Sequence, residues 1–128
     1  MTPETLLLRQ INPSWIQNNR VTSQAFKPTP KDEKKLSVYD GDQIDAEASW
    51  RHFSGSQGLQ SIGVLAVSHR ECTDQDLDVQ PSPERFPEHV DISFEGANSN
   101  TAIKRLAQLL TAAALERGWQ FRANEGEP

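Results

Sequence analysis

Apolar residues fall in short, separated runs along the chain, and the pattern within each run predicts an element. Residues 6–11 form an apolar run that Asn12-Pro13 stops, which favours a strand. Residues 36–39 and 90–94 alternate between apolar and polar side chains, as half-buried strands do. The most apolar run, residues 62–67, predicts the central strand of a sheet.

Two stretches have the spacing of amphipathic helices. A short helix is predicted at about 45–53, because apolar side chains recur there at i, i+4 and i+7: Ala46, Trp50 and Phe53. Asp45 supplies a carboxylate that can accept the free N–H groups of the first turn. A longer helix is predicted over residues 101–117, ended by Gly118. Its apolar stripe is expected to consist of Ile103, Leu106, Leu110 and Ala113, widened by Leu109 and Leu115.

The remaining segments read as turns, loops and brief extended pieces. We expect a turn anchored by Trp15, a short extended segment at residues 21–26 and a flexible connector at 54–60. Two prolines make residues 81–83 irregular, because proline lacks the N–H group that helices and sheets use. The alternation of residues 119–122 adds a short edge strand.

The length and order of these elements predict one domain. With 128 residues the chain has the length of a single domain, and a second core would be too small to stand alone. Four or five strands and two helices, without strict strand–helix alternation, predict a single α+β domain over residues 1–123 with a mixed or mostly antiparallel sheet. Within it, residues 27–35 carry four lysines and two prolines and are expected to form a mobile loop. Residues 124–128 are expected to be a frayed tail.

Charge is distributed unevenly along the chain. Residues 1–39 carry six Lys and Arg against three acidic residues, a net charge of +3, whereas residues 40–99 carry three Arg against twelve acidic residues, a net charge of −9. A chain polarised in this way either folds its two halves against each other or presents each to a different partner. The overall charge of −5 disfavours binding to RNA or single strands by the lysines of residues 27–35.

The number of cysteines and the hydropathy of the chain indicate in which cellular compartment the protein is expected. The chain has one cysteine, so it forms no internal disulfide and gives no reason to infer an oxidising compartment. The N-terminus lacks the basic and apolar regions of a signal peptide. No apolar run approaches the ~20 residues that a membrane span needs. These observations predict a soluble, cytoplasmic protein.

Metal and cysteine chemistry are disfavoured by the residues present. The three histidines, His52, His69 and His89, lie far apart, and none has further ligands at the spacing of a metal site. We therefore expect no metal. Cys72 is disfavoured as a nucleophile, because the acidic residues around it would raise the pKa of its thiol.

Other polar residues are candidates for a site. Arg20 stands next to the hydroxyl groups of residues 22–23, and a guanidinium with hydroxyls can hold a phosphate or carboxylate. Ser23 is therefore a candidate ligand, and Arg9 on the first strand could converge on the same face. His52 and His89 are candidate proton carriers, His89 because it precedes a strand beside a carboxylate. For each residue the alternative is structural: it caps a turn or covers an edge.

The order of several features resembles a known layout: Arg9 on the first strand, Asn19-Arg20 before Val21-Thr22-Ser23, the strand at 36–39 and the helix at 46–53. Residues 6–53 thereby resemble the front of compact NAD-handling toxins of the RES and ADP-ribosyltransferase-like group. Asn19 stands where that pattern has glycine, and Val21 where it has an aromatic residue. The resemblance implies a nucleotide pocket in which Arg9, Arg20 and Tyr39 contact a dinucleotide.

Two hypotheses of function follow. The first is a small interaction or regulatory module, antitoxin-like or immunity-like, that uses no cofactor and binds a basic partner protein by charge complementarity. The second is an enzyme acting on a nucleotide or NAD, with Arg9 and Arg20 holding phosphates and His52 or His89 carrying protons. The second requires Arg9, Arg20, Tyr39 and one histidine to line a single concave pocket.

Overall fold

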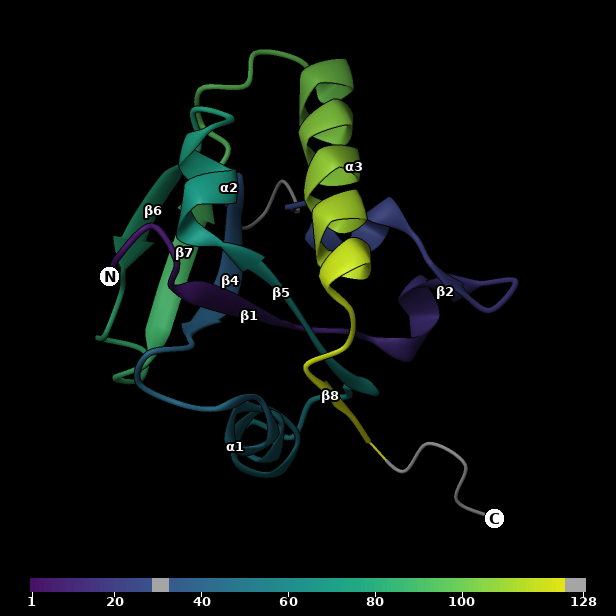
Figure 1. Ribbon diagram of the computed structural model, residues 1–128, viewed down its shortest axis with the longest axis vertical. Helices are drawn as coiled ribbons and strands as arrows, with labels where there is room; N and C mark the ends of the chain where they lie inside the picture. Colours follow the sequence, from purple (N-terminus) through teal and green to yellow (C-terminus); the bar gives the residue numbers. More distant parts are fainter. Residues whose placement is uncertain (29–32, 124–128) are drawn as a thin grey trace.

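The computed structural model describes residues 1–28 and 33–123, which form one α+β domain (Figure 1). Its main sheet has six strands in the order β6-β7-β4-β1-β5-β8, and every neighbouring pair is antiparallel. The strands are β1 (Leu6–Gln10), β4 (Lys35–Asp40), β5 (Gly63–Ser68), β6 (Asp78–Pro81), β7 (His89–Ser93) and β8 (Phe121–Arg122). The antiparallel α+β class is confirmed, with six strands in place of the four or five expected.

Three α-helices accompany the sheet in the described residues: α1 (Ala46–Arg51), α2 (His69–Thr73) and α3 (Asn100–Arg117). The carboxylate of Asp45 accepts a hydrogen bond from the Ala48 N–H at 2.8 Å, which confirms the expected cap of α1. A π-helical turn, His52–Ser56, continues α1 into the stretch expected to be a flexible connector. Two 3₁₀ turns, Pro13–Trp15 and Ser23–Phe26, complete the fold.

Two features of the sheet differ from expectation. Strand β5 is buried at all six positions but lies next to the edge strand β8, so β4 and β1 are the central strands. Residues 81–83 were expected to be irregular because of their prolines, and Pro81 is the last residue of β6. Pro81 nonetheless pairs in register with Val90, and β6 is an edge strand, where a residue without an N–H group is tolerated.

The segment at residues 21–26 is extended only at its start, Val21 and Thr22. Strands β2 (Ile16–Gln17) and β3 (Arg20–Val21) form a small separate hairpin. Asn18 and Asn19 between them have φ angles of 52° and 64°, the left-handed conformation that a two-residue hairpin turn requires and that asparagine adopts readily. The chain then folds into the 3₁₀ turn Ser23–Phe26, which buries Ala25 and Phe26.

The sheet is covered on both faces, by different elements. On the first face α3 and the turn Ser23–Phe26 pack against the larger core. Its strand residues are Leu7, Leu36, Val38, Leu65, Val67, Val79, Val90 and Ile92, and Ile11, which follows β1, belongs to the same core. On the second face Trp50 and Phe53 of the α1 segment pack on a smaller cluster of Leu8, Tyr39, Val64 and Ala66. Figure 1 shows α3 (yellow-green) in front of the sheet and α1 seen end-on below it.

Helix α3 presents a different stripe from the one expected. The buried residues are Ile103, Ala107, Leu110, Thr111 and Ala114. Leu109 and Leu115 are 41% and 42% exposed, so they do not widen the stripe. Ala107 and Ala114 are 0% exposed, so small side chains occupy part of the buried stripe, and Leu106 packs against the core from a partly buried position.

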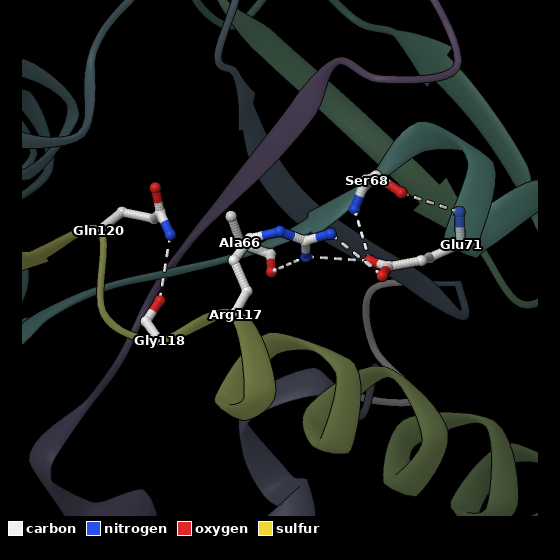
Figure 2. A network of polar contacts seen from close by, with 6 residues as sticks. All are labelled: Ala66, Ser68, Glu71, Arg117, Gly118 and Gln120. Atoms are coloured by element: carbon white, nitrogen blue, oxygen red, sulfur yellow. Dashed lines mark hydrogen bonds and ion pairs between the residues drawn. The ribbon is translucent and has the colours of Figure 1, made fainter.

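The start of α2 is joined to the end of α3 by a polar network (Figure 2). Ser68 and Glu71 form a capping box at the start of α2. The Arg117 guanidinium donates to both carboxylate oxygens of Glu71, at 3.0 and 3.1 Å, and to the Ala66 carbonyl at 2.9 Å. Partial burial of Glu71 raises its pKa, but the hydrogen bonds from Arg117 and Ser68 outweigh this, so the pKa lies below its ordinary value.

Parts of the two expected mobile segments lie outside the described residues, namely 29–32 and 124–128. Around the first gap, Pro28 is buried and β4 begins at Lys35. Lys34 donates from Nζ to the Ala97 carbonyl at 3.1 Å. The described part of residues 27–35 therefore includes residues that are packed or bonded to the domain.

Candidate functional site

A cavity of about 120 Å³ opens on the second face of the sheet, beside the π-helical turn. Residues of β1, β4 and β7, of the chain that follows α1 and of the loop before β7 line it. They are Arg9, Gln10, Ser37, Val38, Tyr39, Phe53, Gln57, Leu59, Arg85, Phe86 and His89. Because these residues come from distant parts of the sequence, only the folded chain assembles the cavity.

The cavity lies where β1 and β4 part. The two strands pair in register at Leu7–Asp40 and Leu8–Tyr39 only, although both continue beyond these pairs. The Arg9 guanidinium bridges the opening, with Nη1 donating to the Ser37 carbonyl at 2.9 Å and Nε to the Ala25 carbonyl at 2.7 Å. It also lies 4.9 Å from the ring centroid of Trp15. Arg9 thus holds the floor of the cavity in place.

Four rings gather on one side of the cavity, with Phe86 among them. The Phe86 centroid lies 4.9 Å from that of Tyr39, 4.7 Å from His52 and 5.0 Å from His89. These separations are those of favourable aromatic pairs. Tyr39, Phe86 and His89 therefore give the cavity an aromatic wall.

The Tyr39 hydroxyl lies 2.8 Å from Nδ1 of His52, which links β4 to the π-helical turn. Burial, and then the negative charge of Glu88, raise the pKa of Tyr39 above its ordinary value. The phenol therefore keeps its proton at neutral pH and can share it with the imidazole.

His89 is 1% exposed, and both of its ring nitrogens are engaged. Nδ1 lies 3.1 Å from the Ser82 carbonyl, and Nε2 lies 3.1 Å from the Ser37 hydroxyl. A carboxylate oxygen of Asp91 lies 3.6 Å from Nε2. Because a carbonyl oxygen can only accept, Nδ1 carries a proton and donates it to Ser82. In the neutral ring, Nε2 is then left to accept from Ser37.

Two polar side chains of the cavity have no hydrogen bond or ion pair with any described residue. The Arg85 guanidinium is exposed at the mouth, and the Gln57 amide lies on the chain that follows the π-helical turn. Arg85 also lines a neighbouring polar hollow of about 280 Å³. Its other lining residues are Glu33, Lys35, Ser37, Ser82, Glu84 and Asp91, so this hollow carries charges of both signs. The positive charge of Arg85 stands beside the aromatic wall.

The structure brings together part of the set expected from the sequence. Arg9, Tyr39 and His89 line the cavity, and His52 adjoins it through Tyr39. Arg20 lies in the small hairpin and Ser23 in the 3₁₀ turn, and neither lines the cavity.

Sequence reasoning missed Ser37, Arg85 and Phe86. Alternation along β4 places Ser37 on the same face as Tyr39, and this signal was available in the sequence. For Arg85 and Phe86, which lie in a loop between prolines, the sequence offers no such signal.

Two other kinds of chemistry are metal binding and reactions of the Cys72 thiol. The described residues contain no group of three or more His, Cys, Asp or Glu that could hold a metal ion. Cys72 is buried, and burial, followed by the charge of Glu71, raises the pKa of its thiol to about 12. No described helix has the length and apolar character needed to cross a bilayer.

Comparison with models of protein families, with curated proteins and with solved structures finds no match to this chain. The resemblance of residues 6–53 to NAD-handling toxins therefore stays a prediction. Function has to be argued from the chemistry of the site.

Proposed function

We propose that the protein binds a compact anion that carries a planar ring, in the cavity beside the π-helical turn. The observation that carries this proposal is the meeting of Arg9, Tyr39 and His89, from three strands, around one cavity. The Arg85 guanidinium, which has no ion pair with any described residue, also lines it. This arrangement supports a small-molecule site, although the nucleotide hypothesis also required Arg20, which lies in the hairpin outside the cavity.

The walls and volume of the cavity favour a ligand that places a single ring inside it. Phe86, Tyr39 and Phe53 present aromatic surface, against which a planar group can stack. The volume of about 120 Å³ approaches the ~150 Å³ of a cavity that holds benzene, and it is smaller than the roughly 300–1,000 Å³ that encloses a drug-sized ligand. A nucleotide would therefore place one ring inside and the rest of the molecule outside.

The anionic group of the proposed ligand is inferred from the charge of Arg85. A planar guanidinium without a partner among the described residues can form paired hydrogen bonds with a carboxylate or phosphate. Arg9 is a weaker candidate for this contact, because its Nε and Nη1 already donate to backbone carbonyls. NAD belongs to the compounds to be tested, although Arg20 and Ser23 stand outside the cavity.

Thermal shift measurements test the proposal with a matched pair of small rings. Nicotinate should raise the melting temperature more than nicotinamide, because only nicotinate carries the anionic group, and binding to the native state stabilises it. AMP and NAD are measured in the same way, because the nucleotide hypothesis predicts that they also raise the melting temperature. Arg85→Ala should remove the preference for nicotinate, whereas Arg105→Ala, an exposed arginine on α3, should keep it. The absence of any shift, or an equal loss in both variants, would contradict the proposal.

A second candidate function is recognition of a basic protein partner in the cytoplasm, in a regulatory, antitoxin-like or immunity-like role. The observation that favours it is that Asp74, Asp76 and Glu95 are exposed and form no ion pair with any described residue. The ladder joins Asp78 to Ser93, which places this acidic group at one end of the sheet. Such a surface can steer a basic partner.

A salt-dependent pull-down from the native host tests this second candidate. A basic protein should be retained at low ionic strength and released at high ionic strength, because exposed charges are screened. Asp76→Asn should weaken the retention, and asparagine tolerates the φ of 61° at this position. Glu116→Gln removes the same charge from an exposed position on α3 and should leave retention unchanged. Retention that is insensitive to salt would rule this function out.

A further inference from the structure

We propose that Ser37 and His89 form a nucleophile–base pair that hydrolyses small esters at the mouth of the cavity. The proposal rests on the proposed function in one respect, namely that the cavity receives the acyl part of the substrate. It assigns a reaction to residues that line the site, one of which, Ser37, the sequence did not single out.

The pair has the geometry that nucleophilic catalysis needs. The Ser37 Oγ lies 3.1 Å from Nε2 of His89, within the distance at which an imidazole can take the hydroxyl proton. Ser37 is exposed on the second face of the sheet, whereas His89 is buried. The nucleophile is therefore open to substrate, and the base is held by packing.

The third group of the arrangement is the Ser82 carbonyl. It receives the proton of Nδ1 at 3.1 Å and so fixes the neutral ring in the tautomer whose Nε2 lone pair faces Ser37. In serine hydrolases a buried carboxylate holds this position. Here the backbone carbonyl orients the ring, which makes Ser82 a positioning residue.

Asp91 acts on the charged form of the imidazole. Its carboxylate lies 3.6 Å from Nε2, and its side chain is 18% exposed. When Nε2 takes the proton from Ser37, the ring becomes positive next to this negative charge. The attraction arises as the proton moves and is absent for the neutral ring, so it stabilises the transition state more than the ground state.

Two hollows meet at the nucleophile. Ser37 and Arg85 line both the cavity of about 120 Å³ and the polar hollow of about 280 Å³. The apolar cavity can take a short or aromatic acyl group, and the polar hollow can take the alcohol. Arg85 supplies a positive charge for the oxygen that becomes negative during attack.

The reaction is a two-step hydrolysis. The Ser37 Oγ bonds to the acyl carbon as its proton passes to Nε2 of His89. The bond from that carbon to the alcohol oxygen then breaks, and this oxygen takes the proton from Nε2. Water attacks the acyl-serine and gives a proton to Nε2, the acid leaves, and the proton returns to the Ser37 Oγ. Ester and water are consumed, and acid and alcohol are produced.

Hydrolysis of p-nitrophenyl acetate and labelling by phenylmethanesulfonyl fluoride test the pair. The wild-type chain should hydrolyse the ester with a rate that Ser37→Ala reduces about 100-fold, the lower end of what general base catalysis supplies. The fluoride should add one sulfonyl group, mapped by mass spectrometry to Ser37. Ser93→Ala removes a hydroxyl on the same face of β7 outside both hollows and should keep rate and label.

A variant of the base completes the test. His89→Gln should abolish the label while leaving Ser37 in place, and circular dichroism must show that this variant is folded. If His89→Gln is not folded, the result for Ser37→Ala tests the proposal alone. Removing the exposed Ser37 hydroxyl creates no cavity in the core, so this variant should fold. Hydrolysis in Ser37→Ala within twofold of the wild-type rate, or a label on another residue, would overturn the proposal.

Failure of this proposal is distinguishable from failure of the binding proposal. If nicotinate stabilises the wild-type chain but Ser37 takes no label and the ester is not hydrolysed, the pair is inert and the cavity still binds anions. If Ser37-dependent hydrolysis occurs without stabilisation by nicotinate, the pair is confirmed and the assigned ligand class is wrong.

Discussion

The Tyr39 hydroxyl and Nδ1 of His52, 2.8 Å apart, join the central strand β4 to the π-helical turn. Tyr39→Phe removes this bond and leaves the ring in place. We expect the free energy of unfolding to fall by about 1 kcal/mol, the net value of a typical hydrogen bond. Urea denaturation measures the change. In a double-mutant cycle with His52→Ala, the two effects should be non-additive, and simple additivity would contradict the link.

The ion pair of Arg117 with Glu71 predicts a pH dependence. The folded-state pKa of Glu71 is lowered, so its stabilisation is present above the unfolded value of about 4.3 and is lost as the pH falls through the folded pKa. At pH 7, Glu71→Gln should lower the free energy of unfolding by about 1–2 kcal/mol, since the side chains are 27% and 33% exposed and partly screened.

The difference between Glu71→Gln and the wild type should shrink towards pH 3, as measured by denaturation at a series of pH values. Glu116→Gln serves as the control, because Glu116 is exposed on α3 and forms no ion pair with a described residue. If the difference in the free energy of unfolding stayed constant from pH 7 to pH 3, the charge of Glu71 would not be what stabilises the contact between α2 and α3.

Cys72 should be inert in the folded protein. Its side chain is buried, and burial, followed by the charge of Glu71, raises the pKa of the thiol to about 12. At pH 8 the native thiol should therefore react with Ellman's reagent at least about 100-fold more slowly than the same thiol in urea, where the pKa returns to about 8.5. Rapid reaction without denaturant would show that the residue is accessible.

Neighbouring leucines on α3 should differ sharply in their effect on stability. Leu110 is buried, so Leu110→Ala should cost about 2–5 kcal/mol through lost burial and the resulting cavity. Leu109 is 41% exposed, and Leu109→Ala should cost less than about 1 kcal/mol. Thermal or urea denaturation compares the two. Equal losses would mean that α3 is rotated relative to the sheet.

The sequence predicts most of the sheet because its pattern is local. Alternation located β4 and β7, and the apolar runs located β1 and β5, since each strand buries one or both faces. The hairpin at Asn18-Asn19 and the edge strand at Pro81 escaped prediction. The edge strand depends on where the chain meets a neighbour, which the local sequence does not show. The hairpin had a local signal, because asparagine readily adopts the turn conformation, but its strands are only two residues long.

The site was predictable only in part. Arg9, Tyr39, His52 and His89 were chosen for their chemistry, and the structure places them at or beside one cavity. Arg20 and Ser23 were chosen because a guanidinium and hydroxyl groups stand together in that stretch of sequence, and the fold places them outside the cavity. Ser37 becomes a candidate only through its contact with His89, which lies 52 positions away in the sequence. No local pattern relates residues that far apart.

The parting of β1 from β4 has a consequence for the architecture of the domain. Elsewhere the ladder is closed by amides and carbonyls, which every residue except proline supplies. At Arg9 a side chain donates to the Ser37 carbonyl of β4 and to the Ala25 carbonyl of the 3₁₀ turn, so the link between β1 and β4 beyond their paired residues depends on the identity of one residue. A lysine has a single amine and cannot bridge two carbonyls with the fixed fork of a guanidinium. The cavity and the side-chain link between the two strands thus arise at the same place, where β1 and β4 part.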